Sequence, residues 1–227
     1  TSNVNPLDSH YAKTSLVSLE DTCNKGGGSI WDLSELREVS KVSRELGLAV
    51  HLDGARLWNA IVARGIHNDV KALQEYGSNF DSISLCFSKG LGCPIGSVLI
   101  GSTSFIAKAH RARKVFGGGM RQAGIVAAAG IYALENNIDR LEIDHARAKR
   151  LGEAALHHPS VISHYPIDTN IVILELQKGV DADALSAEWG RNGIECFQFG
   201  PSSIRFVTHL DNTDAQIDAA CNYLSKI

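Results

Sequence analysis

Apolar and polar residues follow two different spacings along the first part of the chain. Short apolar or alternating runs, typical of β-strands, cover 14–20, 48–52, 83–87 and 97–100. Segments with the pattern of helices cover 32–46, 55–64, 69–76, 104–115 and 122–134. Strands that alternate with helices in this way predict an α/β fold built on a parallel sheet.

The pattern changes after about residue 140. A long amphipathic helix is predicted over 138–156. It is followed by segments in the order strand, strand, helix, strand, strand, helix, at 161–165, 170–176, 181–190, 194–198, 204–207 and 214–225. That order is typical of a small α+β domain. We therefore predict two domains, residues 1–140 and 141–227, with the boundary inside the long helices.

The composition is that of an ordinary globular protein. The chain has 227 residues, of which 44% are hydrophobic, and a formal net charge of -3. No block of like charge offers the electrostatic footprint of a nucleic-acid-binding protein. No apolar run approaches the roughly 18 residues of a transmembrane helix. We therefore expect neither nucleic acid nor a membrane among its partners.

The cysteines bear on the compartment and on metal binding. There are five of them, widely spaced and without a CxxC pair. An odd number at such spacing is typical of reduced thiols rather than of a disulfide framework or a zinc site. We therefore expect a cytoplasmic protein without a metal.

One lysine stands in an unusual place. Lys89 follows the strand predicted at 83–87 and opens a loop that contains Gly90, Gly92 and Gly96. Because the interior of a sheet is a poor place for an ammonium group, Lys89 must reach water or a paired site. In a cofactor pocket, a partly desolvated lysine can lose its proton and attack a carbonyl. The alternative is a solvated lysine in a turn.

An aspartate stands in the matching place on another strand. Asp53 closes the strand predicted at 48–52, and ligands of open α/β sheets lie beyond such strand ends. Alone, Asp53 is better explained as the N-cap of the next helix. Together with Lys89 it suggests a pyridoxal phosphate site, in which the lysine forms the Schiff base and the carboxylate keeps the pyridine nitrogen protonated.

Two further arginines could bind an anion. Gly117–Gly119 precede a predicted helix with Arg121 in its first turn, an arrangement that can bind a phosphate or carboxylate. The alternative is a hinge beside a solvated basic face. Arg205 lies between Ile204 and Phe206 in a predicted strand and points to the opposite face of the sheet. It could bind a substrate carboxylate through two nitrogens, or it could be a surface arginine.

Four motifs, in this order, resemble those of the low-specificity L-threonine aldolases, which are pyridoxal 5'-phosphate (PLP) enzymes of the aspartate aminotransferase fold (fold type I). They are Leu-Ala-Val-His-Leu-Asp-Gly-Ala-Arg at 48–56, Ser-Leu-Cys-Phe-Ser-Lys-Gly-Leu-Gly at 84–92, Arg-Lys-Val-Phe-Gly-Gly-Gly-Met-Arg-Gln-Ala-Gly at 113–124, and Ile-Arg-Phe-Val-Thr-His-Leu-Asp at 204–211. The resemblance implies that residues 1–140 are the C-terminal part of the PLP-binding large domain. Residues 141–227 would be its small C-terminal α+β domain.

The resemblance also implies a role for each matched residue. Lys89 matches the Schiff-base lysine, and Asp53 matches the partner of the pyridine nitrogen. Arg56 and Arg205 match arginines that hold the substrate α-carboxylate, Arg56 lying beside the cofactor as well. His10 matches a catalytic histidine near the substrate β-hydroxyl.

Two basic residues have a looser match. Arg121 and Lys114 match residues close to the cofactor phosphate and the substrate. Asp21 and Cys23 stand where the family motif has asparagine and histidine.

The implied reaction is retro-aldol cleavage of L-threonine, L-allo-threonine and related L-3-hydroxy amino acids to glycine and an aldehyde, in a homo-oligomer (dimer or tetramer). Two alternatives remain open. One is another fold type I enzyme, a β-eliminating lyase or an aminotransferase. The other is a catalytically incomplete fragment, because the family's upstream phosphate-binding residues and ring-stacking histidine have no counterpart here. We therefore expect this chain to be the C-terminal part of a longer protein.

Overall fold

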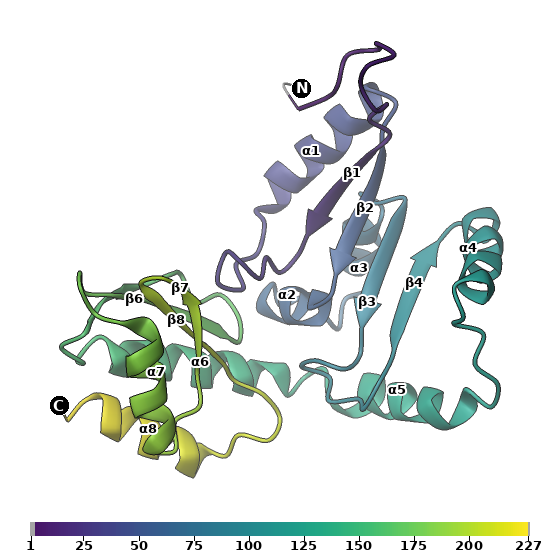
Figure 1. The fold of residues 1–227 in the computed structure, drawn as a ribbon. Helices are drawn as coiled ribbons and strands as arrows, with labels where there is room; N and C mark the ends of the chain where they lie inside the picture. Colours follow the sequence, from purple (N-terminus) through teal and green to yellow (C-terminus); the bar gives the residue numbers. More distant parts are fainter. Residues whose placement is uncertain (1–2, 227) are drawn as a thin grey trace.

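Two four-stranded sheets organise the part of the chain that the structure, a computed structural model, describes, residues 3–226 (Figure 1). The strands of the first sheet stand in the order β1-β2-β3-β4. They are β1 (Leu16–Glu20), β2 (Ala49–Gly54), β3 (Ser82–Cys86) and β4 (Ser97–Gly101). The first three strands are parallel, so their carboxyl ends meet at one edge of the sheet.

The prediction of an all-parallel first sheet is wrong at β4, which runs antiparallel to β3. The physical reason is the short connection. Only residues 87–96 join the two strands, whereas a parallel return needs a crossover of about a dozen residues or more. The chain therefore reverses directly after Lys89.

Helices alternate with or follow these strands close to where the pattern predicts them. They are α1 (Leu33–Glu45), α2 (Leu57–Ala63), α3 (Val70–Gly77), α4 (Thr103–Val115) and α5 (Gly124–Asn136). Helix α1 begins after Asp32, whose carboxylate accepts a hydrogen bond from the N–H of Ser34. It buries Leu36 against Val50 and Leu52 of β2, and this apolar contact forms the core of the sheet.

The second sheet is antiparallel, in the order β5-β6-β8-β7. Its strands are β5 (Val161–His164), β6 (Ile171–Leu176), β7 (Phe197–Gly200) and β8 (Ser203–Val207), with α6 (Leu141–Ala155), α7 (Ala182–Arg191) and α8 (Asp214–Leu224). Trp189 of α7 is fully buried and stacks on Phe206 of β8. The division into domains 1–140 and 141–227 stays a prediction, although α6 begins at Leu141.

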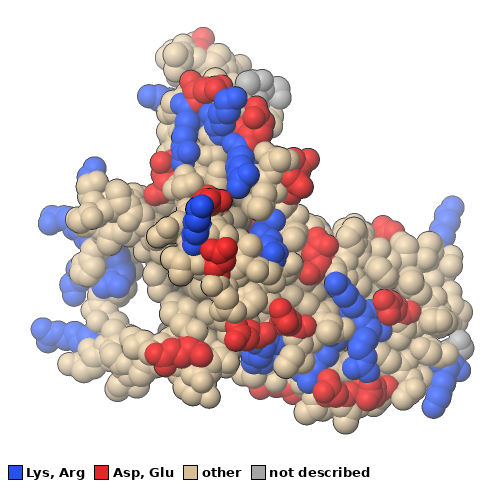
Figure 2. Space-filling view, turned by 180° about the vertical axis from the view of Figure 1, so that it is seen from behind, with Lys and Arg blue, Asp and Glu red and all other residues tan. Residues whose placement is uncertain are grey.

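The region from β4 to α5 exposes much apolar surface. Every residue of β4 is exposed, α4 buries no residue, and α5 buries only Ala133. Among the described strands, β4 pairs only with β3. Helix α4 also carries basic side chains, seen at the left of Figure 2, whereas acidic and basic residues are mixed elsewhere on that face. Apolar surface and a free strand edge of this kind are usually covered in a soluble protein.

An ion pair is buried beside the ends of β1 and β2. The carboxylate of Asp21 is fully buried and accepts hydrogen bonds from Arg64 (3.0 Å) and from the Tyr76 hydroxyl (2.8 Å). Arg64 also donates to the carbonyl oxygen of Trp31 at 2.6 Å. Burial, and then the charge of Asp21, raises the pKa of Tyr76, which therefore stays protonated and donates. Asp21, which stands where the family motif has asparagine, therefore has specific hydrogen-bond partners in the fold.

Two findings concern membrane insertion and metal binding. Within residues 3–226, none of the helices combines the length and the apolar character that crossing a membrane requires. In the same range, no three or more His, Cys, Asp or Glu side chains cluster as they would around a metal ion.

Removing Arg64 tests the buried ion pair. We expect Arg64→Ala to lower the free energy of unfolding by about 3–5 kcal/mol, because it leaves the buried Asp21 carboxylate without its cation. Urea denaturation measures the change. Arg150→Ala is the matched control, because it breaks the exposed pair with Asp218 and should cost less than about 1 kcal/mol. Equal effects of the two substitutions would contradict the importance of burial.

Candidate active site

Lys89 lines a cavity of about 390 Å³ where the two sheets meet. One wall comes from the loop after β3, at 88–93, and another from Arg56 at the start of α2. Asn170, just before β6, and Val207, at the end of β8, form the side that belongs to the second sheet. The amine of Lys89 therefore stands at an exposed position in a space that suits a small molecule.

Backbone hydrogen bonds hold the loop that carries Lys89. The N–H of Gly92 donates to the carbonyl of Lys89 at 2.8 Å, and the N–H of Cys93 donates to the carbonyl of Phe87 at 3.1 Å. Gly92 has a φ of +74°, in the left-handed region that favours glycine. The reversal after β3 is therefore a defined turn that fixes the main chain at Lys89.

Two arginines belong to elements that reach this cavity. Arg56 lines it directly, and Arg205 lies on β8, whose last residue, Val207, lines it as well. Burial, and then the charge of Arg205, lowers the pKa of Arg56. Arg205 donates to Oδ1 of Asn24 at 2.9 Å and lies over the ring of Phe199, and its buried Nε has no acceptor among the described residues. Two cations on these elements and a free buried donor favour binding of an anion.

Asp53 lies at the end of β2, next to the strand that leads to Lys89. In the sheet it stands opposite Glu20 of β1 and Ser84 of β3. The side chain is exposed, and its Oδ1 accepts a hydrogen bond from the N–H of Ala55 at 3.0 Å. The N-cap of α2 is Arg56, so the alternative explanation of Asp53 as the cap is wrong.

Asp53 of β2 and Arg205 of β8 lie on strands beside the cavity without lining it, and the other three predicted residues do not line it either. His10 is exposed, and its ring pairs with Asp8 at 2.7 Å. The segment before β1 lies at the amino ends of the strands, opposite the end where the cavity is (Figure 1). Lys114 and Arg121 are exposed near the turn between α4 and α5 and do not line the cavity. Their proposed roles stay predictions.

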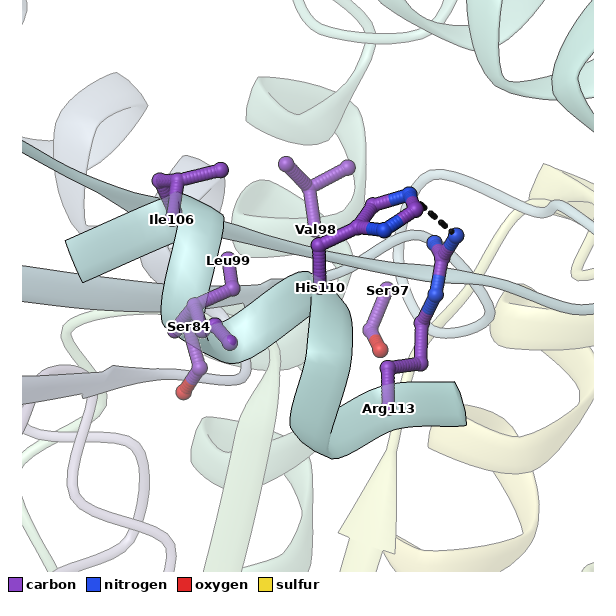
Figure 3. Close-up of a pocket in the computed structure, with 8 residues that line it drawn as sticks. Ser84, Ser97, Val98, Leu99, Ile106, His110 and Arg113 are labelled. Atoms are coloured by element: carbon purple, nitrogen blue, oxygen red, sulfur yellow. Dashed lines mark hydrogen bonds between the residues drawn. The ribbon is translucent and has the colours of Figure 1, made fainter. Parts of the chain in front are cut away.

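A second cavity, of about 420 Å³, lies between β4 and α4 (Figure 3). Val98 and Leu99 of β4 and Ile106 of α4 give it apolar walls. At one side His110 accepts a hydrogen bond from Arg113 at 3.1 Å. It contains no lysine, and so it lacks the amine on which the chemistry predicted from the sequence depends. We place the candidate active site in the Lys89 cavity for that reason.

A buried polar network adjoins the Lys89 cavity and was not among the predictions. Asn59 of α2 donates to Nε2 of His145 at 3.1 Å and to Oδ1 of Asn170 at 3.3 Å. Asn170 donates in turn to the carbonyl of Thr208 at 2.8 Å. All four residues are buried. A polar residue inside the apolar helix α2 was the one signal that could have revealed it.

The comparisons with known proteins agree with this architecture. Residues 2–178 match the family model described as "Beta-eliminating lyase". The chain belongs to the beta-eliminating lyase family. It is 46% identical over 170 residues to the "Low-specificity L-threonine aldolase" of Candida albicans, covering 75% of this chain and 43% of that protein. It is 40% identical over 214 residues to the "Low specificity L-threonine aldolase" of Escherichia coli (strain K12), covering 94% of this chain and 60% of that protein.

Comparison with solved structures shows the fold of this member of the beta-eliminating lyase family. The threonine aldolase of Leishmania major superposes with a TM-score of 0.76 at 19% identity, over 96% of this chain and 63% of that one. Threonine aldolases and aminotransferases share the arrangement, which confirms the predicted fold type I. The predicted resemblance to low-specificity L-threonine aldolases is also confirmed. The chain spans only about half of the two relatives' lengths.

The buried histidine makes stability depend on pH. Burial, and then the charge of Lys149, lowers the pKa of His145 from 6.5 to about 4. Because the unfolded chain binds this proton more readily, we expect stability to fall as pH drops from about 6.5 to about 4, by up to about 3 kcal/mol. Urea denaturation at a series of pH values measures this.

The control for this prediction is His145→Gln. Its side-chain carbonyl can accept the hydrogen bond from Asn59, but it does not titrate. The variant should lose much less stability across the same pH range. An unchanged profile would show that another group causes the dependence.

Proposed function

We propose that this chain belongs to a PLP-dependent carbon-carbon lyase that cleaves L-threonine, L-allo-threonine and related L-3-hydroxy amino acids to glycine and an aldehyde. The observation that carries the proposal is the grouping of Lys89 and Arg56 in one cavity, with Arg205 on the strand whose last residue, Val207, lines it and Asp53 on the adjacent strand end. The names of the relatives support the same reaction.

The residues present fit one end of the cofactor. The Lys89 amine can attach to its aldehyde, and the Asp53 carboxylate can accept a hydrogen bond from its pyridine nitrogen. The unpartnered Nε of Arg205 is a donor suited to the carboxylate of an amino acid bound beside the cofactor. The phosphate end is different, because Lys114 and Arg121 lie away from the cavity in this chain. A complete phosphate site therefore requires residues beyond those that line this cavity.

Each of these four residues would have a distinct task in the proposed reaction. PLP, when bound, would supply an electron sink for the pair left when a carbon-carbon bond breaks. Lys89 would provide the amine that holds it. Arg56 and Arg205 would bind the substrate carboxylate and so orient the bond that breaks. Asp53 would accept the hydrogen bond that favours a protonated pyridine nitrogen.

Assembly and location are part of the same proposal. A homo-oligomer, dimer or tetramer, is supported by the family resemblance and by the apolar region from β4 to α5. A cytoplasmic location is supported by the cysteines, all five of which are free.

Removing the amine tests the cofactor site. We expect the chain mixed with PLP to gain absorbance near the edge of the visible range, and borohydride reduction followed by peptide mass mapping to place the label on Lys89. Lys89→Ala should lose both signals because no other lysine lines the cavity within the described residues. Lys71→Ala, on the exposed side of α3, is the control that should retain them. Label on a different lysine would exclude Lys89 as the anchor.

The reaction is tested by its products. Aldehyde release from L-threonine supports the aldolase reaction, whereas ammonia or keto acid would identify an eliminating lyase or an aminotransferase. We expect Arg205→Ala to raise KM at least about tenfold with a smaller effect on kcat, since a charged hydrogen bond to the carboxylate contributes about 1.5–3 kcal/mol. An unchanged KM would contradict the role of Arg205 in binding the carboxylate.

A further inference from the structure

Asn59 is a polar residue in an apolar helix. Its neighbours Leu57, Ala60 and Ile61 are all buried, and Asn59 is itself only 2% exposed. A buried amide is costly unless its hydrogen bonds are made. Here the side-chain nitrogen has two hydrogens and two acceptors, Nε2 of His145 and Oδ1 of Asn170. Both donors are therefore used.

The chemistry of these partners fixes the orientation of the Asn59 amide. An amide nitrogen can only donate, so Nε2 of His145 must accept, and the ring is neutral with its proton on Nδ1. In this orientation the amide lies against Gly90, the residue after Lys89. A Cβ at Gly90 would lie 3.1 Å from Oδ1 of Asn59 and 2.9 Å from Cδ2 of Leu141. The main chain at Gly90, next to Lys89, thus packs against the Asn59 amide.

The second arm of the network reaches the opposite wall of the cavity. Asn170 donates to the carbonyl of Thr208 (2.8 Å), and the N–H of Thr208 donates back to the carbonyl of Asn170 (3.0 Å). The Thr208 hydroxyl donates to the carbonyl of Asp144 on α6 at 2.6 Å. Asn170 itself lines the Lys89 cavity, and Arg205 lies three residues before Thr208 on β8.

We infer that Asn59 is a positioning residue, whose amide sets the place of Lys89 relative to the strand that carries Arg205. One side chain contacts the turn of the first sheet and bonds to the second sheet, and His145 prevents it from rotating. The inference rests on the proposed function, because it takes Lys89 to be the cofactor anchor. The positioning itself is measured without a cofactor.

Hydrogen exchange of the chain without cofactor gives the first measurement. The amides of Gly92 and Cys93 are bonded within the Lys89 turn and report on its order. In Asn59→Ala we expect both to exchange at least about tenfold faster than in the wild-type chain, the effect of losing one or two buried hydrogen bonds. Ile61→Ala, on the same helix but facing the sheet, is the control for lost stability alone.

A pair of His145 substitutions separates positioning from packing. His145→Gln keeps an acceptor for Asn59 and should leave exchange at Gly92 and Cys93 close to that of the wild type. His145→Leu removes the acceptor and should loosen the turn as Asn59→Ala does. This pair also decides the matter should Asn59→Ala fail to fold. Equal exchange in the Gln and Leu variants, or in Asn59→Ala and Ile61→Ala, would overturn the inference.

Uptake of PLP gives a second measurement that keeps the two proposals apart. Asn59→Ala should bind PLP at least about tenfold more weakly than the wild-type chain, by absorbance titration and by the borohydride label on Lys89. Ile61→Ala should bind within a factor of about two, since its cavity is untouched. A wild-type chain that takes up no PLP would refute the proposed cofactor site, while the exchange data would still decide the role of Asn59.

Discussion

The parallel register of β1, β2 and β3 is the constraint on which the candidate site depends. It aligns Glu20 with Asp53, and Asp53 with Ser84, so that three strands end at the same edge of the sheet. The chain then turns back within ten residues, too few for a helical crossover. The turn therefore stays at that edge, and Lys89 stays with it. A one-residue shift in the register of a strand would move its side chains to the other face of the sheet, and the candidate site would be lost.

Buried polar groups add to the strand register in fixing where the ends of the strands lie. Asp21 and Arg64 are both removed from water, which is tolerable because they pair and because Tyr76 and Trp31 each add a hydrogen bond to the pair. The Asn59 network links α2 to the second sheet in the same way. Groups that must be paired to be buried allow few alternative arrangements, so they hold the ends of the strands in place. By contrast, Arg56 and Arg205 are like charges, and the charge of Arg205 contributes to lowering the pKa of Arg56, a pairing that favours an anion as ligand.

Much of this could be predicted from the sequence. The elements were located to within a few residues because strands and helices leave different apolar periods in this chain. Lys89, Asp53, Arg56 and Arg205 could be singled out because each stands in a recognisable motif. The antiparallel direction of β4 was not predicted, although the short connection between β3 and β4 is enough to infer it. The role of His145 could not be predicted, because its contact with Asn59 spans 86 positions and local spacing carries no trace of it.

Local pattern and motif are enough to predict the elements, the family and the residues that could perform chemistry. Only the folded chain shows which of those residues meet. Lys89 and Arg56 line one cavity, Arg205 lies on the strand of the second sheet whose last residue, Val207, lines it too, and His10 is not among its lining residues. The fold also supplies partners for Asp21, whose role no neighbour in the sequence explains. The reason is physical: burial and pairing depend on contacts between distant segments, and only the folded chain makes those contacts.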